Sequence, residues 1–334
     1  HAPQAAMIDP AAGSVLSVAE ALTNIVWAPL SEGLDSVSLS ANWMWPCKNP
    51  GEDARLYKAV EACSRFACEL GINIPTGKDS LSMTQKYGDE KVYSPGTVII
   101  SAGAEVSDVK KVVSPVLVRD ARTAVYYIDF SFDALSLGGS AFAQSLGKVG
   151  CQAPTVQDSE YFASAFNAIQ QLISEGLILA GHDISAGGMI TALLEMNFAN
   201  TEGGLEVKLD KLPEKDLIKI LFSENPGVLI QVKDRKAVEK ILEEAGVGYA
   251  VVGHPCSERH ILVSKDGAEY LFGIDHLRDV WFSSSYLLDR KQSGEAQAKA
   301  RFLNYKEQPL HYHFGKSFTG KMEQYGISAD RRKP

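Results

Sequence analysis

Segments with the apolar pattern of a β-strand alternate with segments patterned as α-helices along most of this 334-residue chain. Residues 123–130 (TAVYYIDF) form a largely apolar run typical of a buried strand. Residues 159–176 (SEYFASAFNAIQQLISEG) repeat apolar side chains every three to four positions, as an amphipathic helix does. Because helices that alternate with strands bury their apolar faces against a sheet, this order predicts an α/β (mixed α+β) fold built in layers.

The first part of the chain predicts two helices and several strands. Residues 13–30 are expected to form a helix entered through Gly13–Ser14 and ended near Pro29. Residues 51–71 predict an amphipathic helix, and residues 72–87 predict two strands separated by a turn at Pro75–Gly77. The apolar stripe of the second helix is expected to consist of Leu56, Val60, Cys63 and Ala67.

The pattern of the sequence changes near Ser114–Pro115, which suggests a division into two modules followed by a tail. We expect residues 1–114 to form a small sheet that is half of a barrel. Residues 115–274 are expected to form a mixed sheet flanked by helices and carrying glycine-rich loops. Residues 275–334 turn polar and aromatic, which predicts a surface helix at residues 289–302 followed by a linker tail.

Composition narrows the classes of function. The net charge of −8 gives no basic face for nucleic acid, so an anionic ligand has to be bound locally, by backbone N–H groups, a few lysines or Mg²⁺. No apolar run approaches the roughly 20 residues of a membrane span. The five cysteines are odd in number and contain no CxxC pair, which favours reduced thiols and a cytoplasmic protein over disulfides or zinc.

Glu20 and Asn24 lie four residues apart in a predicted helix and therefore share one face. A carboxylate and an amide oxygen on one face suit Mg²⁺, which prefers hard oxygen ligands and water. The alternative is an ordinary solvated helix face, and the spacing alone does not decide between them.

A second polar group follows Gly77, where Lys78 and Ser80 could meet a phosphate or a substrate. The glycine would let the backbone approach a ligand closely. The segment lacks the frame of a Walker A loop, and a β-turn with turn-forming residues is the alternative.

Two glycine-rich segments, residues 137–147 (LGGSAFAQSLG) and 182–190 (HDISAGGMI), each precede a predicted helix. Free N–H groups at a helix start favour an anion such as phosphate. In the second segment, Ser185 could donate a hydrogen bond to that phosphate, and Asp183 could hold a metal. Simple helix capping is the alternative. His182 is interpreted as a packed, hydrogen-bonded histidine, and His311 with His313 as a surface or strand-edge pair rather than a metal site.

Six motifs in this order are more specific than any one alone. They are GSVLSVAEALTN, LSANWMWP with GEDARLYKAV, IPTGKDSLSM, LGGSAFAQ, HDISAGG and FSENPG. Together they resemble the large, single-chain phosphoribosylformylglycinamidine synthases, a family of the aminoimidazole ribonucleotide synthetase superfamily. The resemblance runs over nearly the whole chain and covers the second of two homologous halves of the synthetase core.

The resemblance implies an ATP-dependent ligase of purine biosynthesis. Such an enzyme converts formylglycinamide ribonucleotide, glutamine and ATP to formylglycinamidine ribonucleotide, glutamate, ADP and phosphate. It implies that the chain works with a first synthetase half and a glutaminase domain, that both lie outside it, and that an aspartate-bearing strand precedes residue 1. None of the five cysteines is assigned the glutaminase nucleophile, and no residue of this chain is assigned a catalytic role.

Residue by residue, the resemblance implies that Glu20, Asn24 and Asp183 are Mg²⁺ ligands and that Ser185 contacts a nucleotide, ATP or ADP. In the large enzymes this group resembles an auxiliary ADP site. The alternative function is therefore a structural ADP–Mg²⁺ binding and interface module without turnover. A kinase or selenophosphate-type enzyme of the same superfamily is disfavoured by the motif LSANWMWP.

The resemblance places Gly77 at a nucleotide contact, and Ser80 and Lys78 at substrate contacts across the pseudo-twofold axis of the synthetase core. This sequence has Lys78 where the related motif has a metal-binding asparagine. A lysine at that position would meet phosphate as a point charge rather than hold metal.

Overall fold

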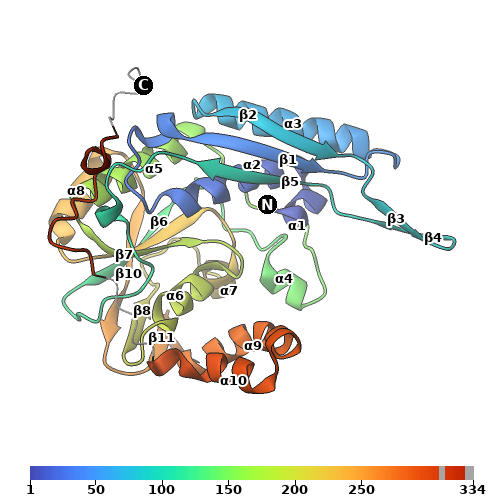
Figure 1. Cartoon of the computed structure of the whole chain (residues 1–334). Coiled ribbons are helices and arrows are strands. Elements are labelled where there is room, and N and C mark those ends of the chain that lie inside the picture. The colour runs from blue at the N-terminus through green and yellow to red at the C-terminus, as the bar shows by residue number, and fades with distance from the viewer. Residues whose placement is uncertain (308–312, 328–334) are drawn as a thin grey trace.

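The computed structural model describes residues 1–307 and 313–327 and contains a small and a large sheet (Figure 1). The small sheet has the strand order β2-β1-β5, and the large one has the order β12-β11-β8-β10-β6-β9-β7. Helices flank both sheets, which confirms the predicted mixed α/β fold with two modules. The strands β3 (Thr84–Tyr87) and β4 (Glu90–Tyr93) form a separate hairpin beyond the small sheet.

In the small sheet, the central strand β1 (Ser38–Met44) pairs parallel with β2 (Asn73–Ser80) and antiparallel with β5 (Thr97–Gly103). Helix α1 spans Pro3–Ile8, and helices α2 (Pro10–Ile25) and α3 (Glu52–Glu69) pack against each other beside the sheet. Helix α2 begins earlier than predicted, because the Asp9 side chain accepts hydrogen bonds from two of its free N–H groups and Pro10 fits the first helical position.

The buried stripe of α3 differs from the prediction at Val60, whose side chain is 41% exposed. The buried residues are Ala59, Ala62, Cys63, Phe66 and Ala67. The Ser14 hydroxyl of α2 donates to the Ala59 carbonyl at 2.8 Å, so the two helices approach on their small side chains. Cys63 and Ala67 of the predicted stripe are therefore buried and Leu56 is partly buried, whereas the small residues Ala59 and Ala62 take the place of Val60.

The predicted turn at Pro75–Gly77 is wrong, because both residues lie inside the single strand β2. Gly77 is paired with Ala41, and a Cβ on Gly77 would lie 2.1 Å from the Ala41 carbonyl oxygen. The glycine therefore permits close contact between strands rather than a turn. Pro75 is tolerated because β2 is an edge strand and its register with β1 shifts nearby.

The large sheet is covered by helices on both faces. Tyr126 and Ile128 of β6 pack with α5 and α8, whereas the alternating residues Val125 and Tyr127 pack with α6 and α7. This is the period-two alternation of a central strand between two helical layers. The strands are β6 (Ala124–Asp129), β7 (Ile178–Ile184), β8 (Gly204–Lys208), β9 (Gly227–Val232), β10 (Tyr249–Cys256), β11 (His260–Lys265) and β12 (Ala268–Gly273). The helices are α4 (Ala141–Ser145), α5 (Ser159–Ser174), α6 (Gly188–Phe198), α7 (Leu217–Phe222) and α8 (Arg235–Glu244).

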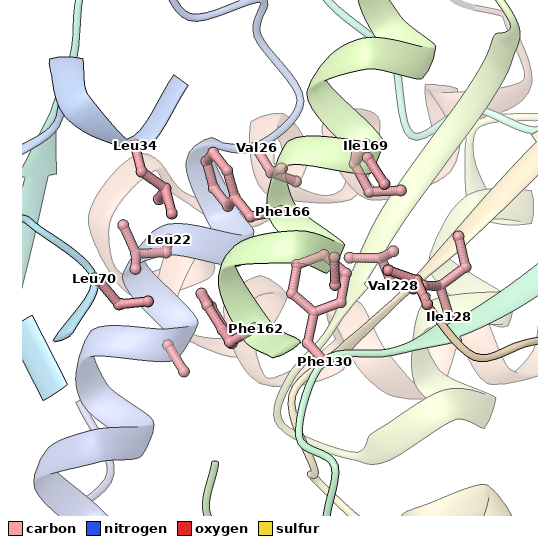
Figure 2. Packing of buried hydrophobic residues seen from close by; sticks show 14 of the residues in the cluster. Leu22, Val26, Leu34, Leu70, Ile128, Phe130, Phe162, Phe166, Ile169 and Val228 are labelled. Atoms are coloured by element: carbon pink, nitrogen blue, oxygen red, sulfur yellow. The ribbon is translucent and has the colours of Figure 1, made fainter. Parts of the chain in front are cut away.

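One apolar cluster joins the two modules. Figure 2 shows Leu22 of α2 and Val26, directly after that helix, lying beside Phe162 and Phe166 of α5. The ring of Phe162 meets Phe66 of α3 edge-on at 5.6 Å between centroids and Phe130, after β6, at 5.4 Å. Helix α5 is thus packed between the helices of the small sheet and one face of the large sheet, which fixes the two modules relative to each other.

The segment after β12 forms two helices rather than the one predicted. Helix α9 (Ile274–Ser293) ends at Gly294, which has a φ of +87°, and α10 (Glu295–Leu303) begins directly after it. Short 3₁₀ helices occur at Gly33–Ser36, Val109–Lys111, Asn304–Glu307 and Met322–Tyr325. His311 and residues 328–334 of the predicted tail lie outside the described residues. No helix in the described part of the chain is long and apolar enough to cross a membrane.

Candidate functional site

A cavity of about 240 Å³ lies where the N-terminal helices meet the loops of the large-sheet module. Its lining includes Glu20 of α2, Gly138 and Gly139 before α4, Ser185 after β7, and Glu224 before β9. The structure therefore brings together residues from four separate segments, three of which the sequence analysis had singled out.

Two of the predicted metal ligands, Glu20 and Asp183, belong to this region. Asp183 is the penultimate residue of β7, is only 8% exposed, and accepts a hydrogen bond from the Trp27 indole Nε1 at 3.4 Å. Burial raises the pKa of the Asp183 carboxyl, and the negative charge of Glu20 raises it further. Glu20 is half-exposed and accepts from the amino group of His1 at 3.4 Å. The two carboxylates are close enough to repel each other, and a cation between them would relieve that repulsion.

The third predicted ligand, Asn24, is exposed one turn further along α2 and does not line the cavity. Within residues 1–307 and 313–327, no three His, Cys, Asp or Glu side chains are gathered closely enough to hold a metal by themselves. The donor set at the cavity consists of carboxylate oxygens, which fits Mg²⁺ rather than a soft metal. Glu20 and Asp183 are the residues that would hold it.

Two positions in the glycine-rich turns, Gly139 and Gly188, have no room for a side chain. Gly188 has a φ of +73°, and a Cβ there would lie 2.6 Å from the Leu221 carbonyl oxygen. Gly139 has a φ of +78°, and its Cβ would lie 2.8 Å from the Ala5 nitrogen. Both turns are therefore held against neighbouring backbone in a conformation that other residues rarely adopt. Ser185 lines the cavity between them, and its carbonyl accepts from the N–H of Gly188 at 3.0 Å.

Glu224 is a site residue that the sequence analysis missed. Its Oε1 accepts hydrogen bonds from the N–H of Ala141 at 2.7 Å and from the N–H of Gly187 at 2.8 Å. Burial raises the pKa of the Glu224 carboxyl, and Glu20 adds to the effect. The signal in the sequence was an acid in the motif FSENPG, to which the sequence analysis had given no site residue. The two helix starts that were predicted to attract an anion thus hold the carboxylate of this protein side chain.

His182 is placed as expected, away from the cavity. Its Nδ1 lies 2.7 Å from the Asp183 carbonyl oxygen and its Nε2 lies 3.3 Å from Oε2 of Glu195 on α6. Burial opposes protonation of the ring, but these two acceptors outweigh it, so the pKa of His182 is raised. The ring lines a different and larger cavity, formed with α9 and α10.

The structure does not bring Gly77, Lys78 and Ser80 to this cavity. Gly77 and Lys78 are exposed on the edge strand β2, and Ser80 ends that strand opposite Met44. Their predicted contacts with nucleotide and substrate belong to a different surface of the chain and stay predictions.

Family models match the two parts of the chain in turn. The FGAR-AT PurM_N-like domain matches residues 1–105, and the AIR synthase related protein, C-terminal domain matches residues 130–264. Phosphoribosylformylglycinamidine synthase of Homo sapiens is 36% identical over 323 residues, which are 95% of this chain and 24% of that protein. The chain belongs to the phosphoribosylformylglycinamidine synthase family. The resemblance found in the motifs is therefore confirmed.

Other relatives of this synthase family agree. The probable chloroplastic/mitochondrial phosphoribosylformylglycinamidine synthase of Arabidopsis thaliana is 37% identical over 295 residues, covering 87% of this chain and 21% of that protein. The chain spans about a quarter of the length of the curated relatives it matches.

Solved structures share the fold at low identity. The structure of Thermotoga maritima PurL complexed with FGAR has a TM-score of 0.65 at 16% identity and covers 83% of this chain and 44% of that one. Hydrogenase maturation protein HypE in complex with ATP has a TM-score of 0.55 at 16% identity and covers 78% of each chain.

Proposed function

We propose that this chain is the second half of the synthetase core of a phosphoribosylformylglycinamidine synthase. The observation that carries the proposal is the convergence of Glu20, Ser185 and Glu224 on one cavity between the two modules, with Asp183 next to the lining residue Ile184. The whole enzyme would use ATP to convert formylglycinamide ribonucleotide and glutamine to formylglycinamidine ribonucleotide and glutamate.

Within this function, the cavity would bind ADP or ATP through Mg²⁺. Glu20 and Asp183 would hold the metal, with Asn24 recruited from the next turn of α2, and Ser185 would donate to a phosphate. Mg²⁺ supplies the positive charge that a phosphate needs, because no lysine or arginine side chain lines the cavity among the described residues.

The partners proposed for the chain are the first synthetase half, a glutaminase domain and the substrate formylglycinamide ribonucleotide. Lys78 and Ser80 are the proposed substrate contacts, and Gly77 is the proposed nucleotide contact. All three lie on the edge strand β2, where the first synthetase half could reach them. We keep the module boundary near residue 114, the tail from residue 275 and a cytoplasmic localisation as further parts of the proposal. Binding of nucleic acid or membrane is not proposed for it.

A second candidate function is a structural ADP–Mg²⁺ module that binds without turnover. It is favoured by the cavity itself, because among the described residues the ionisable side chains that line it are Glu20, Glu224 and His1, and no described cysteine, lysine or tyrosine does so. An auxiliary nucleotide site needs ligands for a metal and a donor to a phosphate rather than a catalytic base, and Glu20 and Ser185 would supply them here.

Phosphate release separates the two functions. The chain would be mixed with a separately produced first synthetase half, and phosphate would be measured with ATP, formylglycinamide ribonucleotide and ammonia, which replaces the glutaminase. The catalytic proposal expects turnover that falls when Asp183→Asn or Lys78→Ala replaces the wild type. Turnover that is lost with Lys78→Ala but unchanged with Asp183→Asn would assign the cavity to the structural function.

A further inference from the structure

The Glu224 carboxylate accepts hydrogen bonds from two loops and so holds them together. It lies in the turn between α7 and β9, and a single oxygen, Oε1, accepts from the first residue of α4 and from the residue that caps α6. These are the N–H groups that the helix starts would otherwise offer to a phosphate oxygen. The chain therefore carries its own anion where a ligand anion would be stabilised.

The charges around this point are unbalanced. Glu20 and Glu224 line the same cavity, and Asp183 directly precedes its lining residues Ile184 and Ser185. The charge of Glu20 contributes to the raised pKa of both other carboxyls. Two cationic groups face these carboxylates: the amino group of His1 lies 3.4 Å from Glu20, and the His182 ring, when protonated, lies 3.8 Å from Asp183. No lysine or arginine lines the cavity in the part of the chain that the structure describes. A metal-free phosphate entering it would meet negative charge with little compensation.

We propose that Glu224 is a specificity-determining residue that restricts this cavity to metal-bound nucleotide. The inference rests on the proposed nucleotide function and adds to it a role for one side chain. The Glu224 carboxylate fills the anion position of the two loops, so a phosphate group binds only when Mg²⁺ bridges it to the carboxylates. Free nucleotide is excluded by repulsion rather than by shape.

The test compares two carboxylates with the same local chemistry. Glu224→Gln removes the charge and keeps an amide oxygen that can accept from Ala141 and Gly187. Glu214→Gln is the matched control, because Glu214 Oε1 also accepts from two backbone N–H groups, those of Lys215 and Asp216, outside the cavity. The dissociation constant of ADP would be measured by calorimetry on the 334-residue chain, once with saturating Mg²⁺ and once with EDTA.

The ratio compared is the dissociation constant of ADP in EDTA divided by that with saturating Mg²⁺. The proposal expects this ratio to fall by about tenfold or more in Glu224→Gln, because one nearby negative charge is removed, and to stay unchanged in Glu214→Gln. An unchanged ratio in Glu224→Gln, with Mg–ADP still bound, would overturn this inference and leave the nucleotide site in place. Failure of every variant and of the wild type to bind Mg–ADP would overturn the proposed nucleotide function and the inference with it.

Discussion

Replacing Gly188 by alanine tests whether the turn after β7 is set by backbone contact. Gly188 has a φ of +73°, and an added Cβ would lie 2.6 Å from the Leu221 carbonyl oxygen, which is backbone and cannot rotate away. The left-handed conformation costs a non-glycine residue about 1–2 kcal/mol. Forcing the turn away from α7 should add about 1–3 kcal/mol, as overpacking of a tight interior does. We expect Gly188→Ala to lower the free energy of unfolding by about 2–5 kcal/mol in all.

Gly147→Ala is the control for this prediction. Gly147 has a φ of +66°, and a Cβ there would have no atom within 4 Å, so only the conformational cost of about 1–2 kcal/mol applies. Urea denaturation followed by circular dichroism measures both variants. Because Gly187, the preceding residue, donates to Glu224, Gly188→Ala should also weaken binding of Mg–ADP. Equal losses of stability in the two variants would refute the contact argument.

Three further predictions follow from burial and charge. Phe162→Ala should lower the free energy of unfolding by about 3–5 kcal/mol in urea denaturation, whereas Tyr57→Ala, at a 68% exposed position, should change it little. Because burial raises the pKa of Asp183 in the folded chain, its ionised form opposes folding: stability from this group is present below the unfolded pKa and is lost as pH rises through the folded pKa. In metal-free buffer, Asp183→Asn should therefore be more stable than wild type at pH 7, and thermal unfolding should show the difference shrinking as the pH falls through the folded pKa of Asp183 and nearly gone below about pH 4. Burial raises the pKa of the Cys63 thiol to about 11, so iodoacetamide should label the exposed Cys68 and Cys151 in the native chain and reach Cys63 only after unfolding, with mass spectrometry as the readout.

The elements that the sequence predicted well are those with a strong period. Residues 123–130 and 159–176 gave a buried strand and an amphipathic helix because the large sheet is covered on both faces, so burial follows local pattern. The wrong predictions concern residues whose conformation or burial depends on contacts with segments that are distant in the sequence. Pro75 and Gly77 read locally as a turn, but Ala41 of the neighbouring strand makes the glycine necessary inside a strand. Val60 was expected to be buried, but the helix α2 packs against α3 at Ala59, whose carbonyl accepts from the Ser14 hydroxyl, and Val60 is exposed.

The site was predictable in part for the same reason. Glu20, Asp183 and Ser185 were marked by residue type and position beside helix starts, and the structure places all three in or beside one region. Glu224 could not be found in this way, because a glutamate in a turn has no local sign of what it binds. Its function depends on two loops that the chain brings together only on folding.

The most direct test of the account is thermal unfolding of the 334-residue chain with and without Mg–ADP, in wild type and Asp183→Asn. Ligand at 100 times its Kd adds about 2.7 kcal/mol of stability, which corresponds to roughly 4 °C in Tm for a chain of this length. The account predicts this upward shift in wild type and little or none in Asp183→Asn. Equal shifts in the two proteins would show that the nucleotide binds elsewhere, and no shift in either would contradict a nucleotide site in this chain.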